Sequence, residues 1–375
     1  MVNGDADHNI PGRVLPVSGF PPALALIYRL IFGLFFVLIF ALLSPARLDA
    51  SSGNSSGKYA GEFMAIGVGG RALALGGASV ALAGDVTAGY WNPAGLSRLS
   101  YPQVGLMHDE RFAGLVNYDY GAAAMPLGSN STVGLGVIRL GVDNIPDTRN
   151  AGIDASGNPL PPDQWQNFAG IDPSRVTWYN SADWAVYFSY AKKANDALSY
   201  GANIKFIRRE NGGASATGVG FDVGAMYAID RLTLGANLQD ATSTLVAWST
   251  GTNEFIVPTL KLGGAYAFEV GGSRLTPVAD ADVRFEGRGS SANLNAGPVS
   301  FDFHAGLEFS FREIAALRVG YTDIGSLSMG AGVKLPKIDI DYSFSKFDDT
   351  DQLGNTHRIS ILFTLEAERF LRPGS

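Results

Sequence analysis

From Tyr101 onward, apolar and polar residues alternate one by one along much of the chain. The segment Val299–Phe311 shows the pattern in full: its odd-numbered positions are apolar, and its even-numbered positions carry Ser, Asp, His, Gly and Glu. Because successive side chains leave a β-strand on opposite faces, this segment has one apolar and one polar face. The same two-residue period recurs towards the C-terminus, so the sequence predicts an all-β protein.

Fourteen such strands can be assigned, an even number, which is typical of single-chain bacterial barrels. Most run about 10–14 residues, longer than the usual soluble strand of about 5–6 and matched to a tilted bilayer crossing of about 9–11. The polar face carries full charges in mid-strand, such as Asp280 and Asp282. We therefore predict a closed antiparallel transmembrane β-barrel over residues 101–375. The predicted strands span 102–112, 115–127, 132–142, 179–192, 198–209, 217–229, 232–244, 256–269, 275–287, 298–311, 316–324, 327–335, 338–346 and 355–368.

The connections between these strands alternate in length. Tight turns are predicted at 128–131, 193–197, 230–231, 270–273, 312–315 and 336–337, whereas 143–178, 247–255, 287–297 and 348–354 are longer and polar. Short turns on one side and long loops on the other are typical of the periplasmic and extracellular ends of outer-membrane barrels. With an even strand count, both ends of the barrel then lie in the periplasm.

Residues 1–50 have the pattern of an export signal. An apolar run over residues 30–43 follows Arg29, and small residues with a proline come next at Ser44-Pro45-Ala46. A basic flank, an apolar stretch of about 7–15 residues and a small-residue exit are typical of a signal peptide. The alternative is a signal anchor that stays attached. We predict a signal peptide, so the chain leaves the cytoplasm; together with the predicted barrel this indicates an outer-membrane location in a Gram-negative bacterium.

Residues 51–100 differ from both neighbouring regions. After a Ser/Gly-rich lead, residues 61–99 carry small residues at close spacing, two Gly pairs and no sustained alternation. This stretch is too apolar for a free tail and too short to build a core of its own. Because Gly and Ala permit close backbone approach, we expect it to fold as a hatch against or inside the barrel.

Several motifs in this stretch resemble a known family. They are Glu62-Phe63, Gly67-Val68-Gly69-Gly70-Arg71-Ala72, Gly76-Gly77-Ala78 and Trp91-Asn92-Pro93-Ala94-Gly95-Leu96, together with the closing segment Leu353-Gly354-Asn355-Thr356-His357-Arg358-Ile359-Ser360. They resemble the signatures of PorV/PorQ proteins, FadL-like outer-membrane barrels of fourteen strands with an N-terminal hatch. The resemblance implies a hatch motif at Arg71, Trp91, Asn92, Pro93 and Ala94. Read without it, Asn92-Pro93 is a plain turn. The chain departs from the usual aromatic C-terminal strand residue by continuing past Phe370.

The third predicted strand, 132–142, breaks the alternation. Gly134, Gly136 and Gly141 interrupt it, and Ile138 and Arg139 reverse its polarity. Glycine inside a strand weakens it and often marks a bulge or kink. FadL-like channels have a kinked third strand that opens the wall sideways, so the resemblance implies a lateral opening at these glycines.

By parity, a set of charged and polar residues faces the lumen. The predicted set is Lys205, Asp222, Lys261, Glu269, Asp280, Asp282, Arg284, Asp302, His304, Glu308, Arg318, Asp339 and Asp341. One interpretation is that they pair with each other and with Arg71 and fill the interior. The other is a conductive polar pore. A plug of some forty residues inside fourteen strands leaves little free lumen, which favours the packed interior.

Composition excludes several classes of function. The chain has no cysteine, so disulfides, zinc–thiolate sites and cysteine nucleophiles are ruled out. Its net charge of −7 without a basic run argues against nucleic acid. The four histidines have no metal-binding spacing, and His304 fits a lumen hydrogen-bond network better. Asp348-Asp349-Thr350-Asp351 suits a solvated acidic loop better than a calcium site. We predict no enzyme activity, no cofactor and no metal.

Three functions remain. The resemblance implies a PorV-like role: binding exported proteins or a secretion channel of the type IX kind through the 143–178 loop, with Trp165 and Phe168 as anchors. The second is FadL-like uptake of hydrophobic small molecules. The third is a structural barrel without cargo. The expected partners are outer-membrane lipid, secretion-system or surface proteins, and a hydrophobic ligand.

Overall fold

The structure is a computed structural model that describes residues 61–112, 114–346 and 355–374. All of these lie in the compact unit Ala50–Ser375. The predicted signal peptide at 1–50 and the acidic stretch at 348–351 lie outside the described residues.

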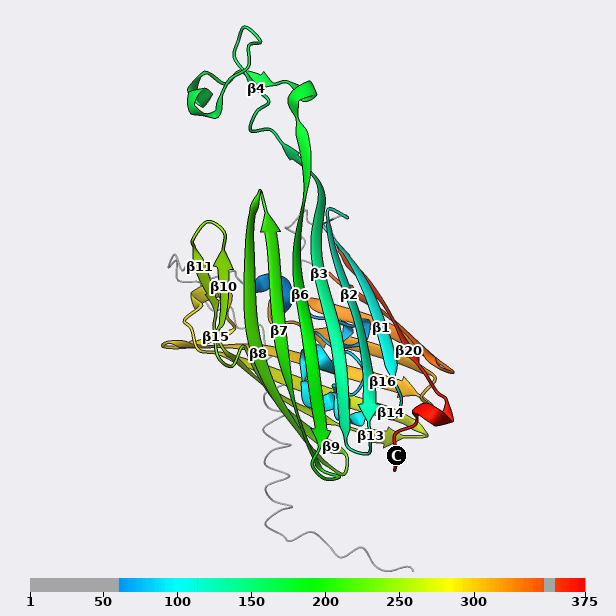
Figure 1. The fold of residues 1–375 in the computed structure, drawn as a ribbon. Helices are drawn as coiled ribbons and strands as arrows, with labels where there is room; N and C mark the ends of the chain where they lie inside the picture. Colours follow the sequence, from blue (N-terminus) through cyan, green and yellow to red (C-terminus); the bar gives the residue numbers. More distant parts are fainter. Residues whose placement is uncertain (1–60, 113, 347–354, 375) are drawn as a thin grey trace, which may run out of the picture. The chain divides into compact units, whose positions relative to one another are not determined.

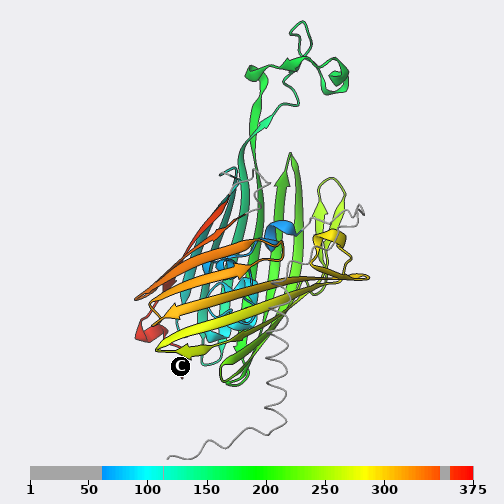
Figure 2. The same ribbon diagram turned by 180° about the vertical axis from the view of Figure 1, so that it is seen from behind.

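The described part of the chain forms a closed antiparallel barrel of fourteen strands, which confirms the predicted fold class. Each strand pairs with the next along the ring, and β1 closes it against β20. Figures 1 and 2 show the ring from opposite sides. Its strands are β1 (Gln103–Arg111), β2 (Val116–Leu127), β3 (Ser131–Asp147), β6 (Thr177–Lys193), β7 (Leu198–Asn211), β8 (Ala214–Ile229), β9 (Leu232–Gln239), β12 (Thr259–Tyr266), β14 (Ser273–Arg284), β16 (Val299–Phe311), β17 (Ala315–Tyr321), β18 (Leu327–Leu335), β19 (Ile338–Ser345) and β20 (Thr356–Thr364).

Shorter elements decorate this ring. β10 (Thr244–Trp248) and β11 (Asn253–Ile256) form a hairpin on the upper half of β8, while β13 (Phe268–Val270) and β15 (Leu294–Ala296) extend the neighbouring ladders. β3 and β6 rise above the other strands and carry a small head with β4 (Gly152–Ile153) and β5 (Gly170–Ile171) (Figure 1). The 3-10 turns are η2 (Pro162–Asn167), η3 (Pro173–Arg175), η4 (Gly289–Ser291) and η5 (Glu368–Phe370).

The alternation in sequence appears directly as burial. Along β7, every second side chain from Ser199 to Ile207 is buried and those between are exposed. The exposed side chains are large and apolar: Phe188 is 52%, Phe206 48% and Leu317 64% exposed. A continuous outer surface of this kind suits hydrocarbon, where the closed sheet also pairs the backbone groups. On the outer face of β6, Tyr190 lies near the C-terminal end of the strand and Trp184 lies near its middle.

The largest differences in length from the predicted strands are at three of them, and the predicted strand 256–269 is in addition divided into β12 and β13. The predicted strand 232–244 ends at Gln239, because Asp240 and Ser243 take left-handed backbone conformations and kink the chain before β10. β3 continues to Asp147 because β6 extends with it. The last strand ends at Thr364, and a strap with η5 follows.

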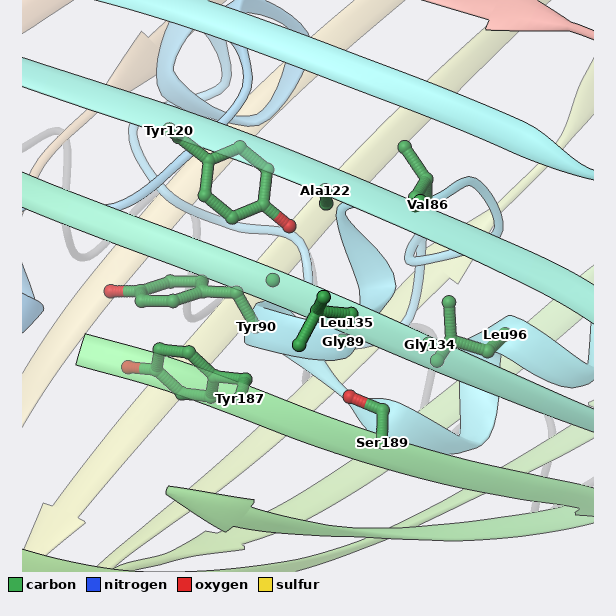
Figure 3. Close-up of a pocket in the computed structure, with 12 residues that line it drawn as sticks. Val86, Gly89, Tyr90, Leu96, Tyr120, Ala122, Gly134, Leu135, Tyr187 and Ser189 are labelled. Carbon is green, nitrogen blue, oxygen red and sulfur yellow. The ribbon is translucent and has the colours of Figure 1, made fainter. Parts of the chain in front are cut away.

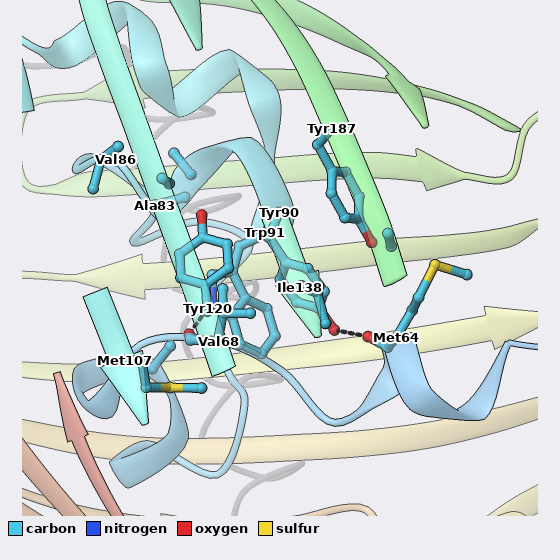
Figure 4. Packing of buried hydrophobic residues seen from close by; sticks show 14 of the residues in the cluster. Met64, Val68, Ala83, Val86, Tyr90, Trp91, Met107, Tyr120, Ile138 and Tyr187 are labelled. Atoms are coloured by element: carbon cyan, nitrogen blue, oxygen red, sulfur yellow. Dashed lines mark hydrogen bonds between the residues drawn. The ribbon is translucent and has the colours of Figure 1, made fainter. Parts of the chain in front are cut away.

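Residues 61–99, called the N-terminal segment below, lie inside the barrel. Their elements are α2 (Glu62–Ala65), α3 (Gly70–Ala74), α4 (Ala88–Trp91) and η1 (Pro93–Arg98). Figure 4 shows how Val68, Tyr90 and Trp91 pack with Tyr120 and Tyr187 of the barrel wall. None of the helices in the described ranges is long and apolar enough to cross a membrane.

Candidate functional site

The N-terminal segment touches the barrel wall at inward-facing glycines. At each of these positions a Cβ atom would lie less than 3.0 Å from an atom of the segment, closer than real Cβ contacts come. The wall has no room for a side chain there. These glycines are Gly105, Gly201, Gly224, Gly235, Gly306, Gly320 and Gly330, on β1, β7, β8, β9, β16, β17 and β18. Backbone of the segment is the close neighbour at Gly201, Gly235, Gly306 and Gly320, and side chains of the segment are the close neighbours at the other three.

Asn92-Pro93-Ala94 forms the turn that fixes the segment against β7 and β8. The fully buried Asn92 donates from Nδ2 to the carbonyls of Val80 and Ala225, each at 3.1 Å, and its Oδ1 accepts from Ala94 N at 3.2 Å. Asn92 therefore caps η1 and also joins the segment to the wall. A Cβ at Gly201 would lie 2.6 Å from the carbonyl carbon of Pro93. The triplet serves as a turn, and none of the cavities described below is lined by its Asn or Pro.

Trp91 is anchored on both sides. Its indole Nε1 donates to the Val68 carbonyl at 2.8 Å, and its own carbonyl accepts from Asn237 Nδ2 of β9 at 2.9 Å. Next to it, Tyr90 donates from its hydroxyl to the Met64 carbonyl at 2.5 Å, and burial raises the pKa of Tyr90. These bonds hold α4 against the rest of the segment.

On the lower side of the segment, Arg71 reaches the wall. Its guanidinium makes two hydrogen bonds of 2.8 Å to the two oxygens of Glu308 on β16. Arg318 donates to Glu308 at 2.6 Å and to Asp341 at 2.6 Å. The Glu308 carboxylate raises the pKa of Arg71, which stays charged. This network joins α3 to β16, β17 and β19.

On the upper side, β12, β14 and β16 supply a second polar network. Lys261 contacts Asp282, His304 Nε2 lies 3.7 Å from Asp282 Oδ2, and His304 Nδ1 bonds the Gly76 carbonyl at 2.8 Å. Asp280 accepts from Ser79 N and Val80 N at 2.6 and 2.8 Å. These strand side chains hold residues 76–80 of the segment.

Two further pairs belong to the predicted lumen set. Arg284 and Arg288 both face Asp302, with Arg284 Nε 3.5 Å from its Oδ2. Asp222 accepts an ion pair from Lys205 at 2.8 Å, and Lys205 also reaches Asp240 at 2.6 Å. Asp240 was not among the predicted lumen residues, because its place inside the barrel depends on the kink after β9.

Asp339 of the predicted lumen set lines the inner cavity described below. Glu269 was predicted to face the lumen, but it is about half exposed and pairs with Arg274, because the strand is interrupted between β12 and β13. The described side chains hold no group of three or more His, Asp or Glu that could bind a metal ion.

The N-terminal segment divides the lumen into two cavities. The outer cavity has about 340 Å³ and is lined on the segment side by Met64, Ile66, Leu73, Tyr90 and Trp91. Phe255 and Ile256 of β11 line its mouth, and the paired charges of Lys261, Asp282 and Arg284 line its far wall. The inner cavity has about 470 Å³ and is lined by Arg71, Arg98, Glu308, Arg318 and Asp341. Burial lowers the pKa of Arg98.

A third cavity lies between the segment and the inner face of β2, β3 and β6 (Figure 3). It holds about 10 Å³, room for a single water. Gly134 and Gly136 line it with Leu96, Tyr120 and Tyr187. Here the contact between the segment and the wall leaves a small space, whereas at the wall glycines the segment leaves no room even for a Cβ atom.

The structure separates the three glycines of the third strand. Gly134 and Gly136 face inward, whereas the missing Cβ of Gly141 points at the Arg139 guanidinium on the opposite face. The ladder passes all three without a register shift, and the bulge lies between Val142 and Ile145, where Asn144 takes a left-handed conformation. The bulge expected at the glycines is therefore absent there: β2 and β6 pair along both edges and keep the wall closed.

Solved structures with the same fold exist. The Ralstonia pickettii toluene transporter TbuX superposes with a TM-score of 0.53 at 15% identity, covering 80% of this chain and 99% of TbuX. The CymD monoaromatic hydrocarbon channel gives 0.54 at 13% identity, covering 80% and 98%. The Pseudomonas putida toluene transporter TodX gives 0.52 at 14%, covering 79% and 96%.

Sequence comparison adds nothing to these structural matches. No protein-family model matches the chain. No curated protein matches it. At such low identities the shared structure shows the fold alone. That fold is the FadL-like barrel of fourteen strands, and in this chain residues 61–99 lie inside it.

Proposed function

We propose that this protein is a non-enzymatic outer-membrane channel for the uptake of hydrophobic small molecules. The neighbours in fold support this, because TbuX and TodX are toluene transporters and CymD is a monoaromatic hydrocarbon channel. Residues 1–50 would be its signal peptide, 51–100 its hatch and 101–375 its barrel. N-terminal sequencing of the mature protein from outer membranes would test that division.

The observation that carries the proposal is the cavity at β3. Tyr90 and Tyr187 line both this cavity and the outer one, so the two spaces adjoin at these two side chains. Next to the two tyrosines, the inner face of β3 carries no side chain at positions 134 and 136, because both residues are glycine. A route from the outer cavity past the two tyrosines ends at the closed wall, and it would reach the membrane when β3 parts from β2 or β6 beside these glycines.

The outer cavity suits such a cargo chemically. Its volume of about 340 Å³ lies within the range of about 300–1,000 Å³ typical of small-molecule sites. Met64, Leu73 and Trp91 offer an apolar floor that an apolar molecule can cover, with a gain of about 25 cal/mol per Å² buried. The charged side chains on the far wall pair with one another, which leaves them little to gain from a polar solute.

Gly136→Val is expected to block uptake without unfolding the barrel. A Cβ at this position would meet Tyr120 Oη at 3.5 Å, an ordinary contact, and the two methyl groups of valine would then occupy the small cavity and press on the rings of Tyr120 and Tyr187. Gly134→Val is more demanding, because Leu96 Cδ1 would lie 3.1 Å from the new Cβ. Uptake of radiolabelled toluene by cells producing each variant would measure the effect, and we expect a fall of about tenfold or more.

Gly121→Val is the matched control for this experiment. Gly121 lies on β2 and faces outward, with only Leu106 Cδ2 near its missing Cβ, at 3.6 Å. This variant should take up substrate at the wild-type rate. Normal uptake by a correctly inserted Gly136→Val protein would refute the route through the wall at β3.

A second function, partner binding of the PorV type, is favoured by the head between β3 and β6. Trp165, Phe168 and Ile171 are each about 45% exposed, and the first two rings lie 5.8 Å apart. The head has its own small core, with Ala151 and Leu160 buried. Ordered, exposed aromatic residues of this kind are typical anchors of protein interfaces. The partner would be an exported or secretion-system protein, as the PorV resemblance implies.

The double variant Trp165→Ala/Phe168→Ala is expected to separate the two functions. It should abolish co-purification of any partner with the protein from native outer membranes, while toluene uptake continues at the wild-type rate. Each anchor of an interface typically contributes about 2 kcal/mol or more, so the loss should be complete. Unchanged co-purification would exclude the head as the binding surface.

A further inference from the structure

The chain does not end with its last strand. After β20, residues 365–374, called the C-terminal strap below, run back under the start of the barrel and include η5. Leu365 N donates to the Pro102 carbonyl at 2.9 Å, and Arg372 N to the Ser100 carbonyl at 2.8 Å. Figure 1 shows this strap in red beside the lower ends of β20 and β1.

Arg372 anchors the strap. Its side chain is buried, with the residue 6% exposed, and it donates from Nε to the Leu99 carbonyl at 2.8 Å and from Nη2 to Thr132 Oγ1 at 2.6 Å. Nη1 lies 3.4 Å from the Ser129 carbonyl. One guanidinium thus joins the end of the N-terminal segment, the β2–β3 turn and the first residues of β3.

These acceptors border the cavity at β3. Thr132 is fully buried and stands two residues before Gly134 on the inward face of β3. Leu99 follows η1 directly, and Leu96 of η1 packs over Gly134. The two walls of the cavity, η1 and β3, are therefore tied together at their lower ends by a residue from the far end of the chain.

Burying a guanidinium is unfavourable unless its donors are satisfied. The planar guanidinium of arginine carries five N–H donors that point in different directions, so it can bond several acceptors at once. The compact ammonium of lysine has three donors on a single nitrogen and cannot reach acceptors that lie this far apart. Arg369, on the same strap, behaves as an ordinary surface residue: it is exposed and lies over the Phe370 ring at 4.6 Å. Of the two arginines on the strap, Arg372 is therefore buried and hydrogen-bonded to other parts of the barrel, whereas Arg369 is exposed.

We propose that Arg372 is a positioning residue that braces β3 against η1 and so limits how far the wall can open at the cavity. The brace follows from the contacts alone, whereas its effect on passage rests on the proposed function. Separating β3 from η1 would break the bonds to Thr132 and Leu99, so the brace opposes that motion. Without it, the wall should open more often and cargo should pass faster.

Amide hydrogen exchange on the full-length protein in lipid vesicles tests the brace. Arg372→Met should accelerate exchange at residues 131–136 and 94–98 about tenfold, which corresponds to about 1.4 kcal/mol of local opening. Exchange in β14 should stay unchanged, since β14 pairs with β12 and β16 and lies away from β3, η1 and the strap. Arg372→Lys should exchange like Arg372→Met, because the hydrogen bonds of the planar guanidinium, and not its positive charge, hold β3 to η1. Arg369→Met is the matched control and should exchange like the wild type.

Two exchange results would overturn the brace: rates in Arg372→Met equal to those in Arg369→Met, or an acceleration spread evenly over the barrel. Toluene uptake then tests the link to passage, with a faster rate expected in Arg372→Met. If Arg372→Met accelerates exchange locally but leaves uptake unchanged, and Gly136→Val still blocks uptake, then the brace does not control passage. If Gly136→Val also leaves uptake unchanged, the proposed route fails while the brace stands on exchange alone.

Discussion

Gly320→Val is expected to displace the N-terminal segment from the barrel. The missing Cβ of Gly320 points straight at the backbone of the segment, where it would overlap Gly76 N and the carbonyl carbon of Leu75. Overpacked sites typically lose about 1–3 kcal/mol. Here backbone, not a flexible side chain, must move, so we expect a loss of about 3 kcal/mol. Urea unfolding in vesicles, followed by tryptophan fluorescence, would measure it as a lower midpoint.

Protease sensitivity distinguishes displacement of the segment from collapse of the barrel. In Gly320→Val, residues 61–99 should become cleavable while the barrel keeps its heat-modifiable migration in gels. Gly121→Val, whose Cβ faces outward near Leu106 alone, should match the wild type in both measurements. If residues 61–99 of Gly320→Val resist the protease and the urea midpoint is unchanged, then β17 moves aside at little cost and the prediction is wrong.

The barrel could be predicted from sequence because it depends on short-range pattern. On β16, the residues that alternate in sequence also alternate in the structure, with Asp302 and Glu308 buried and Leu307 and Phe309 exposed. A one-residue slip would turn every such side chain to the wrong face, so the pattern fixes the register strongly. The number of strands and the lengths of the turns between them could be predicted from the same two-residue alternation.

The interior could be predicted only in part. Parity placed Asp222, Asp282 and Glu308 inward, but it does not say which charge meets which, because partners come from different strands. Asp240 was missed because its inward position comes from a kink at left-handed residues, which alternation does not reveal. The positive-φ backbone of a non-glycine residue is rare, and only the Asp-Ala-Thr-Ser stretch after Gln239, rich in turn-forming residues, hinted at it.

The wall glycines and the strap show a second limit. Glycine at 201, 224 or 320 looks like a weak strand position in the sequence, since glycine disfavours strands. Glycine is required at these positions because each lies against the N-terminal segment, which is more than a hundred residues away along the chain. A single sequence does not reveal such a contact. Arg372 resembles a surface charge in a polar tail, yet it is buried among acceptors from the end of the N-terminal segment, the β2–β3 turn and the start of β3.

Lys205→Met is expected to be the most destabilising single change among the lumen charges. Lys205 is only 3% exposed in its side chain and lies between Asp222, fully buried, and Asp240, 10% exposed. Asp240 also accepts from Thr244 Oγ1 at 2.5 Å, and its backbone N donates to Asp222 at 2.9 Å. The ammonium is the cation that both carboxylates share, so the kinked chain after β9 depends on it.

Methionine keeps the length of the lysine stem but leaves two buried carboxylates facing each other. Removing one partner of a buried ion pair costs about 3–5 kcal/mol, because the charge left behind has neither water nor a counter-charge. The midpoint of urea unfolding should fall accordingly. Arg208→Met on the same strand is the control: Arg208 faces outward, with Glu210, and both side chains are about half exposed, so we expect a loss below about 1 kcal/mol.

The double variant Lys205→Met/Asp240→Asn separates charge from packing. It removes one of the two carboxylates and leaves Asp222 with its bonds from Asn203 Nδ2, at 3.0 Å, and from the backbone N of residue 240. If repulsion between the carboxylates causes the loss, this variant should be more stable than Lys205→Met alone, although it carries one more substitution. If the methionine stem simply packs badly, the second substitution should restore nothing. A single variant as stable as Arg208→Met would show that water reaches this part of the lumen and screens both carboxylates.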